Sequence, residues 1–266
     1  MPGTRYRTLV VKKSVKVTPH MQRVIFTGDD LADFPKNYES GYVKLFFSQD
    51  GGAISDRYQL DGSQYSRRIY TVRSFSRRDN ELAIEFSLYR RKGGLASQWA
   101  EVTKPGDKVL MDGPKLIKRV DNNSDWFLLA ADMSGLPALC CNLESLPSQA
   151  QGYVVIEVVS DLDKQVLKTP DGMAISWIVN DNPGKNSDAL LTGIKSLSWK
   201  HGNPYVWIAG ESNSIRKIRH YIGSRNVSKE NMYIASYWKL GYVKENHGIG
   251  KQISSLCKML ANFVRA

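Results

Sequence analysis

The stretch Val120-Asp121-Asn122-Asn123-Ser124-Asp125-Trp126-Phe127-Leu128-Leu129-Ala130-Ala131 divides the 266-residue chain into two different patterns. Its first half is polar, and its second half is an unbroken apolar run, which is typical of a strand buried on both faces of a sheet. We therefore place a domain boundary at about residue 123, with one domain over residues 1–123 and a second over residues 124–266.

Before the boundary, short β-rich runs alternate with turn signals such as Lys104-Pro105-Gly106-Asp107. Residues 84–88 alternate between apolar and polar side chains, which indicates a strand with one buried face. Six runs of this kind, with one short helix, predict a six-stranded antiparallel β-barrel. We expect the helix at residues 95–103 and the strands at residues 8–17, 22–27, 42–48, 67–76, 81–89 and 108–112.

After the boundary, nearly continuous apolar runs alternate with helical segments. This order predicts βαβ units and a parallel sheet with helices on both faces, the architecture of a nucleotide-binding α/β domain. We expect strands at residues 126–131, 153–159, 175–179, 205–209 and 232–237, and helices at residues 134–146, 187–197 and 213–222. Apolar residues then recur every three or four positions over residues 247–266, which predicts a C-terminal amphipathic helix that packs against its own domain rather than a membrane or a partner.

The chain is strongly basic. Lys and Arg number 37 against 26 Asp and Glu, which gives a net charge of +11. Such a charge suggests three kinds of partner: nucleic acid, an anionic membrane or an anionic small molecule. The cations are spread along the chain, and the sequence contains no nucleic-acid-binding motif. We therefore expect a solvated basic surface and no nucleic-acid binding. Binding of an anionic ligand in a basic groove stays an open possibility.

Composition also indicates in which compartment the protein resides and whether it binds a metal ion. The apolar runs fall far short of the roughly 20 residues of a membrane-spanning helix, and the first residues lack the apolar run of a signal peptide. Cys140, Cys141 and Cys257 are too few for a disulfide framework and suit a reducing compartment. The four histidines lie far apart, and no cysteine–histidine spacing suggests a metal site. We expect a cytoplasmic monomer without membrane insertion and without a bound metal ion.

A barrel followed by a nucleotide-binding α/β domain is the layout of ferredoxin-reductase-like flavoproteins, and two segments of the first half suit a flavin. Arg68-Ile69-Tyr70-Thr71 offers a guanidinium for a flavin phosphate, an aromatic face for the flavin ring and a hydroxyl near its N5 atom. Gly93-Gly94-Leu95-Ala96-Ser97 opens a helix whose amides suit a pyrophosphate. Alone, these segments are also typical of an ordinary strand and of a turn with a serine N-cap. Their order within one all-β half predicts FAD binding.

Two segments of the second half suit a pyridine nucleotide. Asp132 and Ser134 lie in the turn after the first apolar strand, where helix N-terminal amides meet a pyrophosphate, although the turn alone is only a capped helix. Asp161 and Asp163 follow the second strand, near the expected adenosine ribose. A carboxylate there accepts hydrogen bonds from the 2′-hydroxyl of NADH and repels the 2′-phosphate of NADPH. We therefore expect the protein to prefer NADH to NADPH. The alternative explanation of the two aspartates is an acidic turn that faces the solvent.

Several segments, in one order, resemble the siderophore-interacting protein family of FAD-dependent ferric-siderophore reductases. The Gly-Glu pair after the strand at 205–209 and the Tyr-Trp pair after the last strand distinguish this family from other flavin reductases. The resemblance covers the chain from about residue 5 to residue 245. The segments are Tyr42-Val43-Lys44-Leu45-Phe46-Phe47, Arg68-Ile69-Tyr70-Thr71-Val72-Arg73, Gly93-Gly94-Leu95-Ala96-Ser97-Gln98-Trp99, Pro105-Gly106-Asp107 with Asp112-Gly113-Pro114-Lys115, Leu136-Pro137-Ala138-Leu139, Trp207-Ile208-Ala209-Gly210-Glu211-Ser212 and Ser236-Tyr237-Trp238-Lys239-Leu240-Gly241.

The resemblance implies a function for each domain. It implies a barrel that binds FAD, an α/β domain that accepts NADH or NADPH, and electron flow through the flavin to siderophore-bound Fe(III), with release of Fe(II). Because FAD carries the redox chemistry, no catalytic side chain is implied. The implied FAD contacts are Arg68, Tyr70, Thr71, Tyr89 (where many members have a histidine), Gly93, Gly94, Ala96, Ser97, Tyr237 and Trp238.

The two substrates have their own expected contacts. For the nucleotide these are Asp132, Ser134, Asp161 and Glu211. For the anionic ferric siderophore they are Lys44, Lys115 and Lys239, the last in place of an arginine that precedes the Tyr-Trp pair in some members. Two other functions stay open: a flavin or electron-transfer reductase of the same fold, and a basic protein that carries ferric siderophore without turnover. The tail after residue 240, longer than in some members, either lies over the site or pads the sheet.

Overall fold

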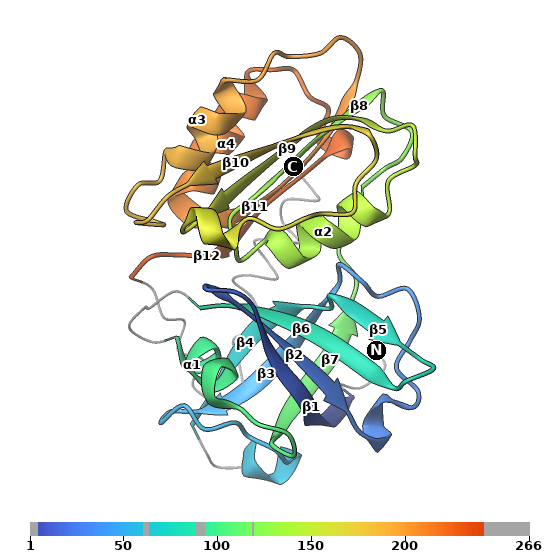
Figure 1. Cartoon of the computed structure of the whole chain (residues 1–266), viewed down its shortest axis with the longest axis vertical. Helices are drawn as coiled ribbons and strands as arrows, with labels where there is room; N and C mark the ends of the chain where they lie inside the picture. The colour runs from blue at the N-terminus through green and yellow to red at the C-terminus, as the bar shows by residue number, and fades with distance from the viewer. Residues whose placement is uncertain (1–4, 61–63, 89–93, 119, 242–266) are drawn as a thin grey trace.

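The computed structural model describes residues 5–60, 64–88, 94–118 and 120–241, which form two domains stacked along the long axis of the molecule (Figure 1). The first domain is a curled antiparallel sheet, and the second is a parallel sheet between two helical layers. Both parts of the predicted fold class are therefore confirmed. The boundary expected near residue 123 falls between the last strand of the first sheet and the first strand of the second, and it stays a prediction.

The antiparallel sheet has seven strands rather than the six predicted, because the strand expected at residues 67–76 is interrupted at Val72 and Arg73. In sheet order the strands are β4 (Tyr65–Thr71), β3 (Tyr42–Ser48), β7 (Lys108–Lys115), β1 (Tyr6–Thr18), β2 (Met21–Thr27), β6 (Glu81–Ser87) and β5 (Ser74–Ser76).

The interruption closes the barrel. β4 and β5 lie at opposite edges of the sheet, yet only Val72 and Arg73 separate them. The Val72 amide donates to the Gly41 carbonyl beside β3 (2.9 Å), and the Arg73 amide donates to the Ala83 carbonyl in β6 (3.0 Å). Because a link this short spans only about 10 Å, the sheet curls until its two edges meet. Helix α1 (Leu95–Val102) covers the apolar interior that results.

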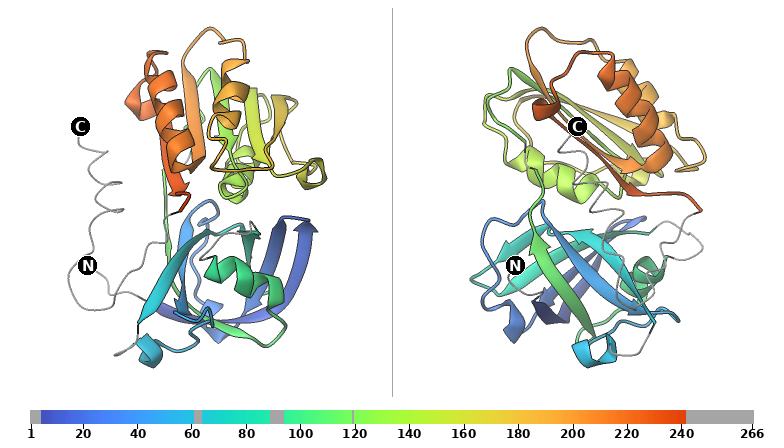
Figure 2. Two further views of the ribbon diagram at one scale, coloured as in Figure 1. Left: turned by 90° about the vertical axis from the view of Figure 1, so that its left-hand side faces the viewer. Right: turned by 180° about the vertical axis from the view of Figure 1, so that it is seen from behind.

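The second sheet is entirely parallel, as predicted. Helix α2 (Leu136–Glu144) covers the face that includes Leu129 and Ala131, and helices α3 (Ala189–Lys195) and α4 (Ser212–Gly223) cover the other face (Figure 2). Burial on both faces explains the nearly continuous apolar runs of the two central strands, at residues 126–131 and 204–211, which are buried throughout. In sheet order the strands are β10 (Gly172–Val179), β9 (Gln151–Val158), β8 (Trp126–Ala131), β11 (Pro204–Glu211) and β12 (Met232–Trp238).

The order of these strands marks a place for a ligand. Successive strands run outward from β8 to β10 on one side and from β11 to β12 on the other, so the order reverses between β8 and β11. In open parallel sheets, ligands bind at such a switch point, outside the carboxyl ends of the strands. The residues that follow β8 and end β11 are therefore those that the fold brings to the expected nucleotide site.

A buried carboxylate connects the two domains. Asp163 is 0% exposed, and it accepts hydrogen bonds from the Thr18 hydroxyl (2.8 Å), the His20 amide (3.0 Å) and the His20 ring Nδ1 (2.8 Å). Burial alone would raise the pKa of Asp163, but these hydrogen bonds lower it further than burial raises it, so the carboxyl stays ionised. The expectation that Asp163 lies near a nucleotide ribose is wrong, because its carboxylate is enclosed between the domains.

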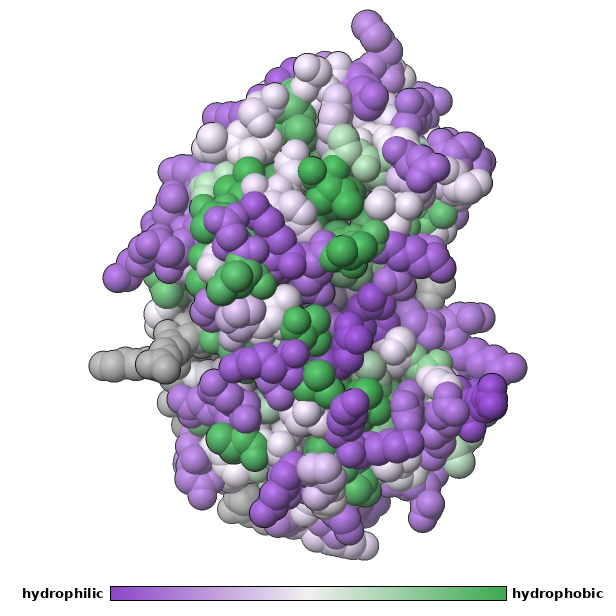
Figure 3. Space-filling view, in the orientation of Figure 1, coloured by the Kyte–Doolittle hydropathy of each residue, from purple (hydrophilic) through white to green (hydrophobic). Residues whose placement is uncertain are grey.

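On the surface, hydrophilic side chains cover most of the face drawn in Figure 3, and apolar side chains gather in small separate groups. Within residues 5–241, apart from the undescribed gaps, no helix is long and apolar enough to cross a membrane. Cys140 and Cys141 are buried free thiols. The predicted helix at residues 247–266 and Cys257 lie outside the described residues.

Candidate functional site

The expected flavin residues of β4 lie on both faces of the sheet. In the pairing with β3, Arg68 is opposite Leu45 and Tyr70 is opposite Val43, both of which belong to the barrel core. The Tyr70 ring packs against this core, with its centroid 4.3 Å from that of Phe86. Because side chains alternate along a strand, Thr71 belongs to the other face.

Arg68 is a cation with no acidic partner among the described residues. One of its guanidinium nitrogens, Nη1, donates to the Arg67 carbonyl at 3.1 Å, while Nη2 is buried and has no hydrogen-bond partner among the described residues. Burial lowers the pKa of Arg68, yet a guanidinium stays protonated at neutral pH. A half-buried, incompletely bonded cation is costly unless an anion completes it. The residues present therefore fit a phosphate of FAD.

The start of α1 also fits a phosphate. Gly94 is the N-cap residue, and no side chain caps the helix among the described residues. The Ser97 hydroxyl donates instead to the Gly94 carbonyl at 2.8 Å, so the alternative of a serine N-cap is wrong. The Ala96 side chain is buried in the barrel core, which leaves only its backbone amide for a ligand. Tyr89 and Gly93, two further expected FAD contacts, lie outside the described residues.

Two of the expected siderophore contacts lie close together on the barrel. In the strand pairing, Tyr42 of β3 lies between Thr71 and Lys115, and the next residue on the same face, Lys44, is opposite Asp112. The Lys44 ammonium is 3.2 Å from an Asp112 carboxylate oxygen, whereas Lys115 is exposed. Lys44 and Lys115 therefore share the face of Thr71, and Lys44 has an acidic partner that the sequence did not indicate.

Three of the expected nucleotide contacts, Asp132, Ser134 and Glu211, lie at the switch point, and the two carboxylates among them accept hydrogen bonds from the chain itself. Asp132 follows β8, and its Oδ1 accepts hydrogen bonds from the Ser134 amide (2.8 Å) and hydroxyl (2.5 Å). Its Oδ2 accepts from the Trp238 indole nitrogen at 2.6 Å. The Asp132 carboxylate thus accepts a hydrogen bond from the Ser134 amide just before α2. The roles of Asp132 and Ser134 toward a nucleotide stay predictions.

Glu211 acts in the same way at the start of α4. Its Oε2 accepts hydrogen bonds from the Asn213 amide (2.5 Å) and the Ser214 amide (3.2 Å), and its Oε1 accepts from the Leu240 amide (3.2 Å). The Ser212 hydroxyl also donates to the Trp238 carbonyl at 2.9 Å. These bonds fasten the segment after β12 to the carboxyl edge of the sheet.

The other expected residues of the second domain are spread around this edge. Exposed Lys239 lies on the fastened segment, while Tyr237 packs against the core on the α2 side. Burial and the neighbouring Tyr233 raise the pKa of Tyr237 well above its ordinary value, so its hydroxyl stays protonated. Asp161 is exposed after β9, and one of its oxygens is 2.5 Å from the Lys164 ammonium. Part of the negative charge expected near a ribose is therefore neutralised.

Glu157 is a buried acid that sequence analysis missed. It lies in β9 next to the switch point and accepts a hydrogen bond from the Asn180 side-chain amide at 3.0 Å. Burial, together with the Asp132 carboxylate, raises the pKa of Glu157 to about 7. Glu157, Asp132 and Glu211 thus form a row of buried carboxyl groups on adjacent strands. An acidic residue inside the apolar run of residues 153–159 was the signal that could have revealed it.

Comparison with known proteins gives one consistent result. Residues 10–117 match the family described as siderophore-interacting FAD-binding domain, and residues 124–241 match the family described as siderophore-interacting protein. The chain is 30% identical over 246 residues to the ferric vibriobactin reductase ViuB of Vibrio cholerae. The matched region covers 87% of this chain and 90% of that protein.

Two further proteins resemble the chain over nearly its whole length. It is 27% identical over 244 residues to the NADPH-dependent ferric-chelate reductase of Escherichia coli, covering 88% of this chain and 93% of that protein. Its structure resembles the crystal structure of a siderophore utilization protein from T. fusca with a TM-score of 0.79 and 26% identity, over 92% of this chain and 97% of that one.

Replacing Glu157 by Gln should stabilise the protein more at pH 8 than at pH 5. The pKa of this carboxyl is about 7 in the folded protein and about 4.3 in an unfolded chain. Between these values the folded state keeps a proton that the unfolded state has released, so stability falls as the pH rises toward 7. The loss is on the order of 3 kcal/mol, and Gln avoids it while keeping an oxygen for the Asn180 amide. Urea unfolding of both proteins at the two pH values measures the difference, and an equal effect at pH 5 and pH 8 would contradict the prediction.

Proposed function

The chain belongs to the siderophore-interacting protein family, and from this premise we propose that it is an FAD-dependent reductase that passes electrons from NADH to the Fe(III) of a ferric siderophore and releases Fe(II). The observation that carries the proposal is the half-buried Arg68 guanidinium, whose Nη2 has no hydrogen-bond partner among the described residues. It lies in the strand that also bears Tyr70. The proposal keeps the division near residue 123, the cytoplasmic location and the monomeric state expected from the sequence.

Each part of the first domain has a task in this function. Arg68 would hold a phosphate of FAD, the amides at the start of α1 would hold its pyrophosphate, and Tyr70 would support its ring. Bound FAD supplies the conversion between the two-electron chemistry of a nicotinamide and the one-electron reduction of iron. Lys115 and Lys44, on the face of Thr71, would attract the anionic iron chelate to the same end of the barrel. Exposed Lys239 would add a third cation from the other domain.

The decisive experiment is turnover under anaerobic conditions. Purified, FAD-loaded protein is mixed with NADH, a ferric hydroxamate siderophore and a chelator that absorbs light only with Fe(II). We expect rapid formation of the ferrous complex that depends on protein and on NADH. Flavin that NADH bleaches without ferrous product would indicate a flavin or electron-transfer reductase instead. Flavin that NADH does not bleach, in protein that binds the ferric siderophore, would indicate a carrier.

The same assay compares the two nucleotides. We expect the larger kcat/KM with NADH, because exposed Asp161 follows β9 at the expected ribose position, although Lys164 neutralises part of its charge. A tenfold advantage of NADPH, worth about 1.4 kcal/mol, would refute this preference without affecting the rest of the proposal.

Replacing Arg68 by Ala should weaken FAD binding by about 10-fold to 100-fold, because a hydrogen bond to a charged group contributes roughly 1.5–3 kcal/mol. FAD content after purification and titration of the flavin fluorescence measure the loss. Arg67→Ala is the matched control, since Arg67 is the adjacent arginine of β4, opposite Phe46 on the other face of the sheet. Equal loss in both variants would remove Arg68 from the FAD site.

Replacing Lys115 by Ala should raise KM for an anionic ferric chelate about fivefold at low salt, with unchanged FAD content, because an exposed ion pair contributes up to roughly 1 kcal/mol. The effect should fade as salt is added. Lys44→Ala should also raise KM, but adding Asp112→Asn should reverse this rise, because Lys44 and Asp112 form a nearly neutral pair. Unchanged KM at low salt in both lysine variants would refute the assignment.

A further inference from the structure

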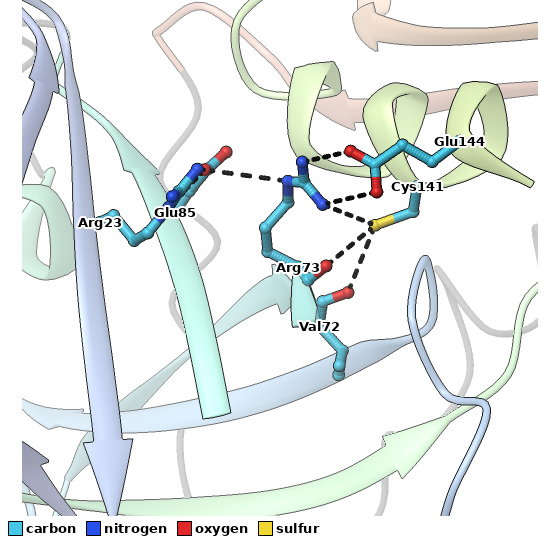
Figure 4. Close-up of polar contacts among 6 residues, drawn as sticks. All are labelled: Arg23, Val72, Arg73, Glu85, Cys141 and Glu144. Atoms are coloured by element: carbon cyan, nitrogen blue, oxygen red, sulfur yellow. Dashed lines mark hydrogen bonds and ion pairs between the residues drawn. The ribbon is translucent and has the colours of Figure 1, made fainter. Parts of the chain in front are cut away.

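Helix α2 rests on the corner of the barrel where β4 turns into β5. Figure 4 shows the Arg73 side chain between Glu85 of β6 and Glu144 of α2. Arg73 Nη2 is 2.6 Å from Glu144 Oε1, and Nη1 donates to Glu144 Oε2 at 3.3 Å, so the guanidinium holds both carboxylate oxygens. Its Nε is 3.9 Å from Glu85 Oε1. One arginine thus connects a barrel strand to a helix of the other domain.

Two neighbouring residues of α2 hold the same corner. The Cys141 thiol donates to the Arg73 carbonyl at 3.2 Å and lies 3.7 Å from the Val72 carbonyl (Figure 4). The Asn142 side-chain amide donates to the Ser40 hydroxyl at 3.0 Å. Burial raises the pKa of Cys141 to about 11, so the thiol stays protonated and remains a donor. The last turn of α2 is therefore bonded to the barrel through three of its residues, Cys141, Asn142 and Glu144.

The two ends of this connection lead to the two expected redox partners. The corner follows Thr71 directly, at the end of the strand that carries Arg68 and Tyr70. Helix α2 begins directly after the Asp132 and Ser134 turn at the switch point. A helix of nine residues is about 13 Å long and stiff, so a shift of its last turn is passed to its first.

A polar cavity of about 90 Å³ lies beside the ion pair, lined by Arg73, Glu85, Cys140, Glu144 and residues 165–168, together with Arg23. Protein interiors are normally close-packed, so a displacement of one group moves the groups that it contacts. Where a cavity replaces such contact, the separation of the two surfaces depends on the bonds that cross it. Here the bonds that border the cavity are those between Arg73 and Glu144, and the Cys141 and Asn142 contacts lie beside them.

We propose that Arg73 is a positioning residue for hydride transfer: by bonding Glu144 it sets the distance between the nucleotide turn before α2 and the flavin residues of β4. This inference rests on the proposed function. It assigns to Arg73 a task distinct from that of Arg68, because its guanidinium faces the other domain and already has an acidic partner. Transfer needs the reacting atoms within about 3.5 Å, so a small change in domain position has a large effect on rate.

The test separates the two halves of the catalytic cycle in Arg73→Gln, Glu144→Gln and the double variant, all loaded with FAD. Rapid anaerobic mixing with NADH measures flavin reduction, and mixing of dithionite-reduced protein with ferricyanide measures flavin oxidation. We expect each single variant to slow reduction about tenfold, with unchanged FAD affinity and unchanged oxidation. The double variant should be no slower than the singles, because the two residues act as one pair.

A readout independent of turnover follows the geometry itself. Hydrogen exchange should become faster in the amides of α2 and of residues 72–75 in both single variants. Arg77→Gln is the matched control, since Arg77 donates to the Ala32 and Phe34 carbonyls within the barrel, and it should change neither exchange in α2 nor flavin reduction. Should Arg73→Gln fail to fold, Glu144→Gln carries the test, because Glu144 lies at the surface of α2.

The inference is overturned if flavin reduction is unchanged in Arg73→Gln or Glu144→Gln. It is also overturned if reduction and oxidation slow equally, which would indicate a role in the fold or in FAD binding. Failure of the proposed function is distinguishable, because wild-type protein would then either not be reduced by NADH or be reduced without forming Fe(II) from a ferric siderophore. Unchanged hydrogen exchange in α2 would still exclude a positioning role in that case.

Discussion

The two-residue connection between β4 and β5 constrains most of the molecule. A flat antiparallel sheet of seven strands would hold its edges about 29 Å apart, at about 4.8 Å for each of six spacings. Val72 and Arg73 cannot bridge that distance, and their amides bond to Gly41 beside β3 and to Ala83 in β6, the second strands from the two edges of the sheet. The sheet therefore closes into a barrel, and the strand with Arg68 and Tyr70 ends at the corner on which α2 rests.

Carboxylates of the chain shape the other side of the site. In a glycine-rich nucleotide loop, free amides at a helix start bind the phosphates. Here Asp132 and Glu211 bond the amides at the starts of α2 and α4, while Asp132 also holds Trp238 at the end of β12 and Glu211 holds Leu240 just after it. Trp238 thus lies beside the switch point, where these carboxylates bond groups of the protein itself. Charge and helix dipole are balanced without a ligand, which explains how acidic residues are tolerated at a buried sheet edge.

The domains are joined at two separate places by polar groups. Asp163 is enclosed by donors from the turn between β1 and β2, and Arg73 bonds Glu144 beside a cavity. Met21 adds an apolar contact, since it belongs to the core of the second domain although it starts β2. Polar contacts have strict distances and directions, so they define relative position more sharply than apolar contact of similar extent.

The sequence by itself determined the fold class, the element order and the chemical types at the site. Periodicity reports locally which face of a segment is buried, which is why the apolar run of β8 and the motif from Arg68 to Thr71 were recognisable. Only the tertiary structure decided which groups are partners. Thr18 and Asp163 are 145 residues apart in the chain, and Arg73 and Glu144 are 71 apart. The split of the strand at residues 67–76, the raised pKa of Glu157 and the Arg68 Nη2 without a partner among the described residues likewise depend on neighbours that the fold supplies. Burial and pairing are properties of the assembled chain and not of a local pattern.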